Sequence, residues 1–243
     1  MQVGYVSFDG QLLHFNNRRN NFRNDARLRR FKMSILDDKV RTSLKKDLAN
    51  LKTNVKLIVF SQEIECPSCK DASSLAEEVA TLSDKISVEK YDFVLNKAQT
   101  EHYKIDKIPA IAVVGAKDFG IRFYGVPGGF EFSSFIDAIK LVSSGDSDLA
   151  QKTKEELAKI TKSVLIKVFV TLTCPYCPAA SKLANRFAIE NDLVISETIV
   201  ATEFPHLSNK YNVFSVPKAV INETVEFEGA LPEEKFLEQI LKT

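Results

Sequence analysis

The sequence of 243 residues contains no tryptophan, only three histidines and only four cysteines. It has no continuous apolar run of about 18 residues, which a membrane-spanning helix would need. Its polar, arginine-rich N-terminus also lacks the apolar stretch of about 7–15 residues that secretory signals contain. These absences exclude a transmembrane helix and a secretory leader, so we expect a cytoplasmic protein without a membrane partner.

All four cysteines stand in two short motifs, Cys66-Pro67-Ser68-Cys69 and Cys174-Pro175-Tyr176-Cys177. Because none is left over for a structural disulfide, an intracellular redox protein fits better than a secreted disulfide scaffold. The motifs are 108 residues apart, and each has an apolar residue followed by a proline, with the proline 43 residues after the first cysteine. These steps are Ile108-Pro109 and Val216-Pro217. The matched spacing predicts a duplicated redox domain.

Cysteines three residues apart suit reversible disulfide chemistry. On a helix their Cβ atoms lie about 5–6 Å apart, so a disulfide can close without backbone movement. A first cysteine at a helix N-terminus is stabilised as a thiolate by the free N–H groups and the helix dipole. We therefore expect Cys66 and Cys174 to attack substrate disulfides, and Cys69 and Cys177 to resolve the mixed disulfides.

The flanking residues predict the same order of elements in both copies. Short β-branched and aromatic runs at 55–60 and 164–170 predict a strand before each motif, and a helical pattern follows each motif. A helix is expected to open each copy, at 34–51 with Ser34 as its cap and at 149–161. Each copy then continues with a strand, a short helix, the strand after the proline, a hairpin strand and a last helix.

These motifs resemble known families. Cys-Pro-Tyr-Cys at 174–177 is the glutaredoxin signature, and the order of elements is similar to the thioredoxin fold. Over 33–243 the chain resembles the protein disulfide oxidoreductases of thermophilic archaea and bacteria. The resemblance implies an α/β protein of two tandem thioredoxin folds, each a mixed central sheet flanked by helices.

The resemblance also implies roles for the two proline steps. In this family the proline is cis and lies beside the CxxC motif. The residue before it offers backbone groups to an extended substrate peptide. Ile108, Pro109, Val216 and Pro217 match these positions, so we expect them to bind substrate.

The implied function is a thiol–disulfide oxidoreductase that reduces, forms or isomerises protein disulfides. Its electron donor would be an enzyme like thioredoxin reductase, which would bind NADPH, so that this chain uses NADPH only indirectly. The glycine-rich loop at 125–129 lacks the strand-to-helix context of a dinucleotide site. We therefore expect no cofactor bound to this chain other than its redox-active disulfides.

The chain departs from the thioredoxin pattern six residues before each first cysteine. Thioredoxins carry a buried carboxylate there, which assists proton transfer, whereas this chain has Phe60 and Val168. Glutaredoxins also lack that carboxylate, so the departure favours glutaredoxin-like chemistry.

The residues next to the two first cysteines predict unequal sites. Glu65 directly precedes Cys66, and a nearby carboxylate raises the pKa of a thiol. Thr173, which precedes Cys174, adds no charge. We therefore expect Cys174 to be the more reactive nucleophile.

Charge and turn residues divide the chain into three parts. Residues 1–32 hold seven Lys and Arg against two Asp, whereas the rest of the chain holds 26 basic and 30 acidic residues. This basic N-terminal arm is predicted to be disordered or to be an upstream extension before Met33. A linker rich in turn residues at 143–148 then separates a first domain at 33–145 from a second at 149–243.

Other classes of protein fit the sequence less well. A thioredoxin-fold peptide-binding or chaperone module would not need both cysteines of each pair. A zinc-stabilised nucleic-acid-binding protein would combine the four thiolates with the basic arm, but about a hundred residues separate the two pairs. We therefore expect no metal site and no nucleic-acid partner. The three histidines form no site, and Lys56 and Lys167 are expected to have solvated tips near strand ends.

Overall fold

The computed structural model describes residues 36–243. The basic arm at 1–32 and the expected cap Ser34 lie outside these residues. The first helix, α1, spans Asp38–Leu48, within the predicted range. Its N-cap is Asp37, whose side chain accepts a hydrogen bond of 2.9 Å from the Val40 N–H.

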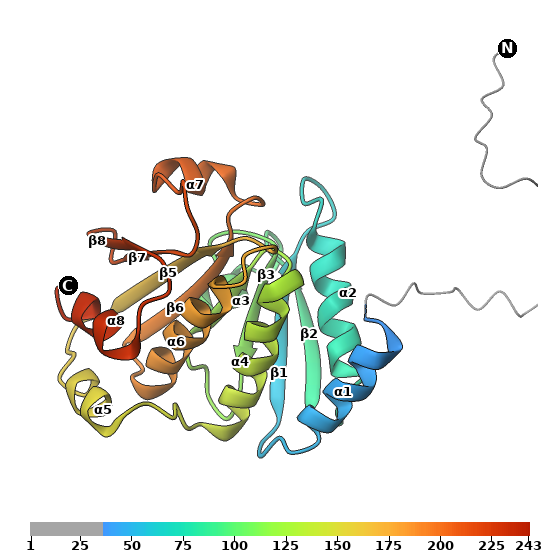
Figure 1. The fold of residues 1–243 in the computed structure, drawn as a ribbon. Helices are drawn as coiled ribbons and strands as arrows, with labels where there is room; N and C mark the ends of the chain where they lie inside the picture. The colour runs from blue at the N-terminus through green and yellow to red at the C-terminus, as the bar shows by residue number, and fades with distance from the viewer. Residues whose placement is uncertain (1–35) are drawn as a thin grey trace, which may run out of the picture. The chain divides into compact units, whose positions relative to one another are not determined.

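The predicted order of elements is confirmed in both copies (Figure 1). The first repeat continues with β1 (Val55–Ser61), α2 (Cys69–Ala80), β2 (Ile86–Asp92), α3 (Lys97–His102), β3 (Ala110–Val114), β4 (Ile121–Tyr124), the 3-10 turn η1 (Gly129–Glu131) and α4 (Phe132–Ser144). The second repeat comprises α5 (Gln151–Leu157), β5 (Val164–Val170), α6 (Cys177–Glu190), β6 (Val194–Val200), α7 (Pro205–Lys210), β7 (Lys218–Ile221), β8 (Val225–Glu228) and α8 (Glu233–Ile240). Helix α5 is shorter than the predicted range 149–161.

The strands form one eight-stranded mixed sheet in the order β2-β1-β3-β4-β6-β5-β7-β8. Within each repeat the first two strands are parallel and the last two pair antiparallel, which is the thioredoxin arrangement. The repeats meet where β4 pairs parallel with β6, from Ile121 opposite Ser196 to Tyr124 opposite Ile199. We call this line the seam. The domain boundaries 33–145 and 149–243 stay a prediction, and the two segments share this sheet.

Helices cover the two faces of the sheet unequally. Apolar side chains of α1, α2, α4, α5, α6 and α8 form the larger core on one face, and those around α3 and α7 form the smaller core on the other. Alternation along the strands supplies both cores. In β1, Leu57 and Val59 enter the larger core, whereas Ile58 and Phe60 enter the smaller one.

Helices α4 and α6 pack against each other beside the seam, so a helix of the first repeat contacts the CxxC helix of the second (Figure 1). Within residues 36–243, no helix has the length and apolar character needed to cross a membrane.

Candidate active sites

The first cysteine pair forms a disulfide in the turn that leads into α2. Cys66 and Cys69 are bridged, with their Cα atoms 5.4 Å apart. The helix begins at Cys69, and the half-buried Cys66 precedes it, with the Cys69 N–H donating to the Cys66 carbonyl oxygen at 3.3 Å. The more exposed sulfur therefore lies at the mouth of the helix and the buried sulfur within its first turn.

The second pair has the same arrangement at the start of α6. Cys174 and Cys177 are bridged, with their Cα atoms 5.5 Å apart. Cys177 is fully buried, whereas Cys174 keeps 8% of its surface exposed. The Cys177 N–H donates to the Sγ of Cys174 at 3.1 Å. Such a hydrogen bond favours the thiolate once the bridge is reduced.

The two proline steps have the expected backbone geometry. The Ile108-Pro109 and Val216-Pro217 peptide bonds are both cis. The Sγ of Cys174 lies 3.7 Å from the carbonyl oxygen of Val216, so the 43-residue spacing does bring the motif and the proline step together. Pro109 and Pro217 are buried directly before β3 and β7, and Ile108 and Val216 are half-buried.

A buried carboxylate that the sequence did not reveal lies next to the second CxxC helix. Glu131, at the end of η1, is fully buried and its side chain accepts a hydrogen bond from Ser134. Burial raises the pKa of Glu131, whereas Ser134 and the α6 residues Ser181 and Lys182 lower it. Ser181 follows Cys177 by one helical turn, so the first repeat places a buried carboxyl group against the CxxC helix of the second repeat.

The segment before Glu131 also supports the second motif. The Phe130 N–H donates to the Leu172 carbonyl oxygen at 2.9 Å, two residues before Cys174. Gly129 has a φ of +54°, and a Cβ atom there would overlap that same carbonyl oxygen. A glycine is therefore required where the two backbones approach most closely.

The second repeat likewise supplies a carboxylate to the first site. Glu203 follows β6, and its carboxylate accepts a hydrogen bond from the hydroxyl of Ser68, inside the first CxxC motif. It also accepts one of 2.8 Å from the Val126 N–H. Gly125 makes room for it, because a Cβ at this residue, whose φ is +89°, would lie 2.8 Å from the Glu203 Oε1.

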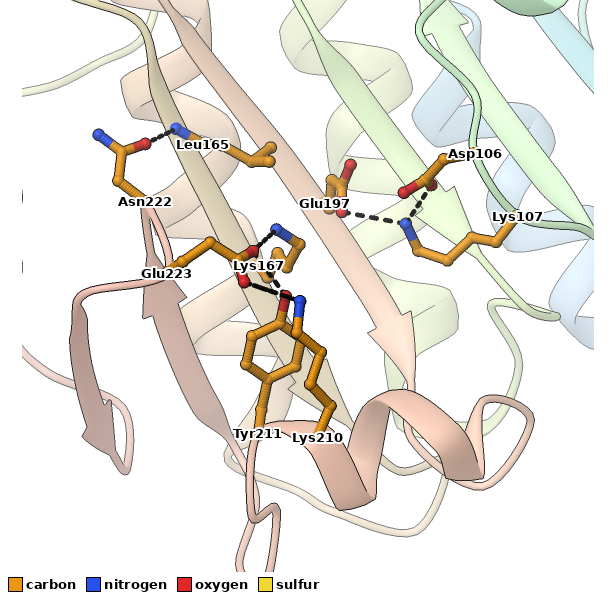
Figure 2. A network of polar contacts seen from close by, with 9 residues as sticks. All are labelled: Asp106, Lys107, Leu165, Lys167, Glu197, Lys210, Tyr211, Asn222 and Glu223. Carbon is orange, nitrogen blue, oxygen red and sulfur yellow. Dashed lines mark hydrogen bonds and ion pairs between the residues drawn. The ribbon is translucent and has the colours of Figure 1, made fainter.

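A buried ion pair crosses the seam near the first proline step. The ammonium of Lys107 lies between the carboxylates of Asp106 and Glu197 and is 3.3 Å from Glu197 (Figure 2). Burial raises the pKa of Glu197, and the charge of Lys107 opposes that rise. The pair thus fixes the loop that leads to Ile108-Pro109.

The expectation of a solvated Lys167 is wrong. Lys167 is buried on the sheet face that carries α7, where its ammonium pairs with Glu223 at 2.6 Å. Tyr211 and Lys210 converge on the same carboxylate at 2.6 and 2.9 Å (Figure 2). Although burial raises the pKa of Glu223, these three partners lower it to about 2. Lys56, in contrast, keeps an exposed side chain and pairs with Glu89 at 2.8 Å.

A cavity of about 600 Å³ lies beside the first disulfide. Cys66, Cys69 and Tyr91 contribute to its wall, together with side chains of both charges, namely Glu63, Lys70, Glu77, Lys90 and Asp92. Among residues 36–243, no group of three or more His, Cys, Asp or Glu side chains is arranged to hold a metal ion. His102 and His206 are exposed on α3 and α7.

The chain is similar to thioredoxin-fold proteins over most of its length. Residues 164–242 match the family described as thioredoxin domain. A protein disulfide oxidoreductase from Aeropyrum pernix superposes with a TM-score of 0.80 at 30% identity, covering 85% of this chain and 94% of that one. The alkylhydroperoxide reductase protein AhpF of Enterococcus faecalis has a TM-score of 0.79 at 27% identity, covering 84% of this chain and 99% of that one.

A curated relative is longer than this chain. A protein named NADH dehydrogenase from Bacillus subtilis is 26% identical over 188 residues, which is 77% of this chain and 34% of the relative. The chain thus spans about a third of the length of this relative.

Proposed function

Because the chain belongs to the family of thioredoxin-fold protein disulfide oxidoreductases, we propose that it exchanges dithiols and disulfides with protein substrates. The two reacting couples are Cys66/Cys69 and Cys174/Cys177. The observation that carries the proposal is that both couples form disulfides at the mouth of a helix, with Cα separations of 5.4 and 5.5 Å. At these separations a disulfide opens and closes without backbone movement.

The second couple has the geometry for the complete exchange. The Cys174 thiolate attacks one sulfur of a substrate disulfide and forms a mixed disulfide, while the other substrate sulfur leaves as a thiolate. The Cys177 thiolate then attacks the Cys174 Sγ, which restores the Cys174–Cys177 bridge and releases the second substrate thiolate. Two electrons pass from the chain to the substrate. Cys66 and Cys69 run the same reaction or pass electrons to the second couple.

The proline steps bind the substrate backbone. The Val216 carbonyl oxygen lies 3.7 Å from the Cys174 Sγ, where a peptide strand carrying the reacting cysteine would pair with it. Two exposed apolar side chains adjoin this point: Phe214, exposed to 91%, and Tyr176, exposed to 72%. They provide an apolar surface for an unfolded substrate segment. Ile108 and Pro109 have the same role at the first couple.

Glu131 takes the place of the carboxylate that is missing from β5. It accepts the proton of the Cys177 thiol when that buried sulfur becomes the attacking group. Its burial and its interaction with Ser181, which follows Cys177 by one turn of α6, support this role.

The electron donor is a reductase that binds a nicotinamide cofactor. The relative from Bacillus subtilis is named for NADH and the relative from Enterococcus faecalis for a reductase, and both names support this proposal. An enzyme like thioredoxin reductase, using NADPH, would fill this role, and the cytoplasm is the compartment that supplies it. In that case this chain holds no cofactor beyond its own disulfides.

Reduction of insulin disulfides with dithiothreitol as the donor tests the function. The full chain should reduce insulin faster than dithiothreitol alone, and Cys174→Ser should lose more activity than Cys66→Ser. A wild-type rate equal to that of dithiothreitol alone would contradict the proposal and favour a peptide-binding module without redox turnover.

A further inference from the structure

The first redox site is built partly from the second repeat. Strand β6 and the residues after it supply two carboxylates to the first site, one to the proline loop and one to the CxxC turn. Glu197 pairs with Lys107, two residues before Pro109, and Glu203 accepts the hydrogen bond of the Ser68 hydroxyl. The CxxC turn and the proline loop of the first couple are therefore both held across the seam.

Glu203 is fixed in this position by several contacts. Its second carboxylate oxygen accepts the Val126 N–H at 2.8 Å, in the loop after β4. Gly125, with no side chain, leaves space for it. The half-buried Glu203 therefore holds its negative charge against the CxxC turn rather than in open solvent, where the charge would be screened.

The charge lies beside the turn that carries the sulfur that must become a thiolate. Ser68, which donates to Glu203, lies between Cys66 and Cys69 in the first motif. A carboxylate near a thiol disfavours the thiolate and raises the pKa of that thiol. A less stable thiolate makes the reduced form less stable, so the couple becomes more reducing.

We propose that Glu203, a residue of the second repeat, makes the Cys66/Cys69 couple more reducing than the residues of the first motif alone would make it. This inference rests on the proposed function, because it assigns a positioning residue to one of its two couples. Other charged groups also lie near Cys66. Glu65 precedes it, and the adjoining cavity is lined by Glu63, Lys70, Glu77, Lys90 and Asp92. Of the charged side chains within residues 36–243, Glu203 is the one that both hydrogen-bonds to the motif and comes from the other repeat.

The redox equilibrium of each couple with glutathione tests the proposal in the full chain. In this equilibrium two glutathione thiols become one glutathione disulfide while one protein disulfide becomes two thiols. Differential alkylation and mass spectrometry of the two motif peptides report both couples in one sample. The pH dependence of iodoacetamide alkylation gives the pKa of Cys66.

Glu203→Gln should stabilise the reduced first couple about tenfold, a shift of about 30 mV toward a more oxidising potential. The pKa of Cys66 should fall in parallel, and the Cys174/Cys177 couple should not change. Glu203→Asp, which keeps the charge, should stay within about threefold of wild type. Glu155→Gln, an exposed glutamate on α5, removes the same charge far from the motif and should leave the first couple unchanged.

The proposal is overturned if Glu203→Gln leaves both the equilibrium and the pKa of Cys66 unchanged. It is also overturned if Glu155→Gln or the second couple shifts equally. If Glu203→Gln does not fold, Ser68→Ala provides the test, because it removes the hydrogen bond that holds the carboxylate against the turn. It should shift the glutathione equilibrium and the pKa of Cys66 in the same direction as Glu203→Gln, and no shift in either would also overturn the proposal. A first couple that never changes state in any glutathione buffer would instead refute the proposed function at this site.

Discussion

The main-chain N–H of Cys177 lies 3.1 Å from the Sγ of Cys174 and donates to it, whereas the matching N–H of Cys69 donates to the carbonyl oxygen of Cys66. The second couple thus has a hydrogen bond that stabilises its thiolate. The first couple instead has the carboxylates of Glu65 and Glu203 near its motif. From both differences we infer that Cys174 is the stronger nucleophile at neutral pH, which stays a prediction.

We therefore expect Cys174 to react with iodoacetamide about tenfold faster than Cys66 at pH 7, which corresponds to a pKa difference of about one unit. The measurement uses the fully reduced chain, with peptide mass spectrometry to follow each cysteine. Denatured protein serves as the control, because both thiols should then react alike. Equal rates in the folded chain, or a faster Cys66, would show that the local charges do not govern reactivity.

Glu131→Gln should slow the release of substrate from the second couple. Burial raises the pKa of Glu131, so its carboxylate forms, and can take a proton from Cys177, only above the usual range of a glutamate. The rate loss should therefore grow as the pH rises through that raised pKa and reach up to about a hundredfold. Single-turnover decay of a Cys174 mixed disulfide, followed against pH, measures it. Glu155→Gln is the control and should keep the wild-type rate. A rate loss of the same size at every pH in Glu131→Gln would indicate that Glu131 has only a structural role.

Phe214→Asp should weaken the action of the second couple on unfolded proteins. Phe214 is almost fully exposed two residues before Val216, and Asp106 occupies the matching position before Ile108. Losing about 1 kcal/mol of apolar contact lowers kcat/KM about fivefold. The assay uses a Cys66→Ser/Cys69→Ser background with insulin or a small disulfide as substrate. The small disulfide, which covers no apolar surface, should be reduced at the wild-type rate, and an equal loss for both substrates would contradict the prediction.

Gly129→Ala should destabilise the chain by about 1–3 kcal/mol and loosen the second motif. Gly229→Ala is a matched control, since Gly229 also has a positive φ, of +85°, but a Cβ there would meet no atom within 4 Å. Both variants put an alanine on a left-handed backbone, so the difference between their urea midpoints measures the effect of the overlap with the Leu172 carbonyl oxygen alone. Equal midpoints would mean that the close approach of these two backbones contributes nothing to stability.

Glu223→Gln should cost stability at neutral pH but not in strong acid. The pKa of Glu223 is lowered to about 2, so its contribution is present above the pKa of an unfolded glutamate, about 4.5. This stabilising contribution is lost as the pH falls from about 4.5 through about 2. Urea unfolding from pH 7 to pH 2 should show the two proteins converging in acid. Glu226→Gln, whose side chain is 59% exposed beside Lys218, is the control and should show a smaller difference. A constant gap between wild type and Glu223→Gln would contradict the assigned pKa.

The sequence predicted the parts of each site that lie within one repeat. The family resemblance implied that the proline step lies beside the CxxC motif, and the structure places the Val216 carbonyl oxygen 3.7 Å from the Cys174 Sγ. The strand and helix patterns located β5 and α6. Such predictions succeed because neighbouring residues determine strands, turns and helices, and because a spacing that occurs twice is unlikely to arise by chance. Lys167 shows the limit of prediction from local sequence, because the pattern of its strand does not indicate that the side chains of Glu223, Tyr211 and Lys210 surround it.

The sequence alone determined the two dithiol motifs, their proline partners and the repeated α/β order, since these depend on residue types at short or matched spacings. Tertiary structure decided what surrounds them. Pairing of β4 with β6 brings Glu131 of the first repeat to the second CxxC helix and Glu203 of the second repeat to the first motif. Neither carboxylate shares a periodic pattern with the cysteines of the site that it adjoins, because contacts across a seam follow from strand register and helix packing rather than from distance along the chain.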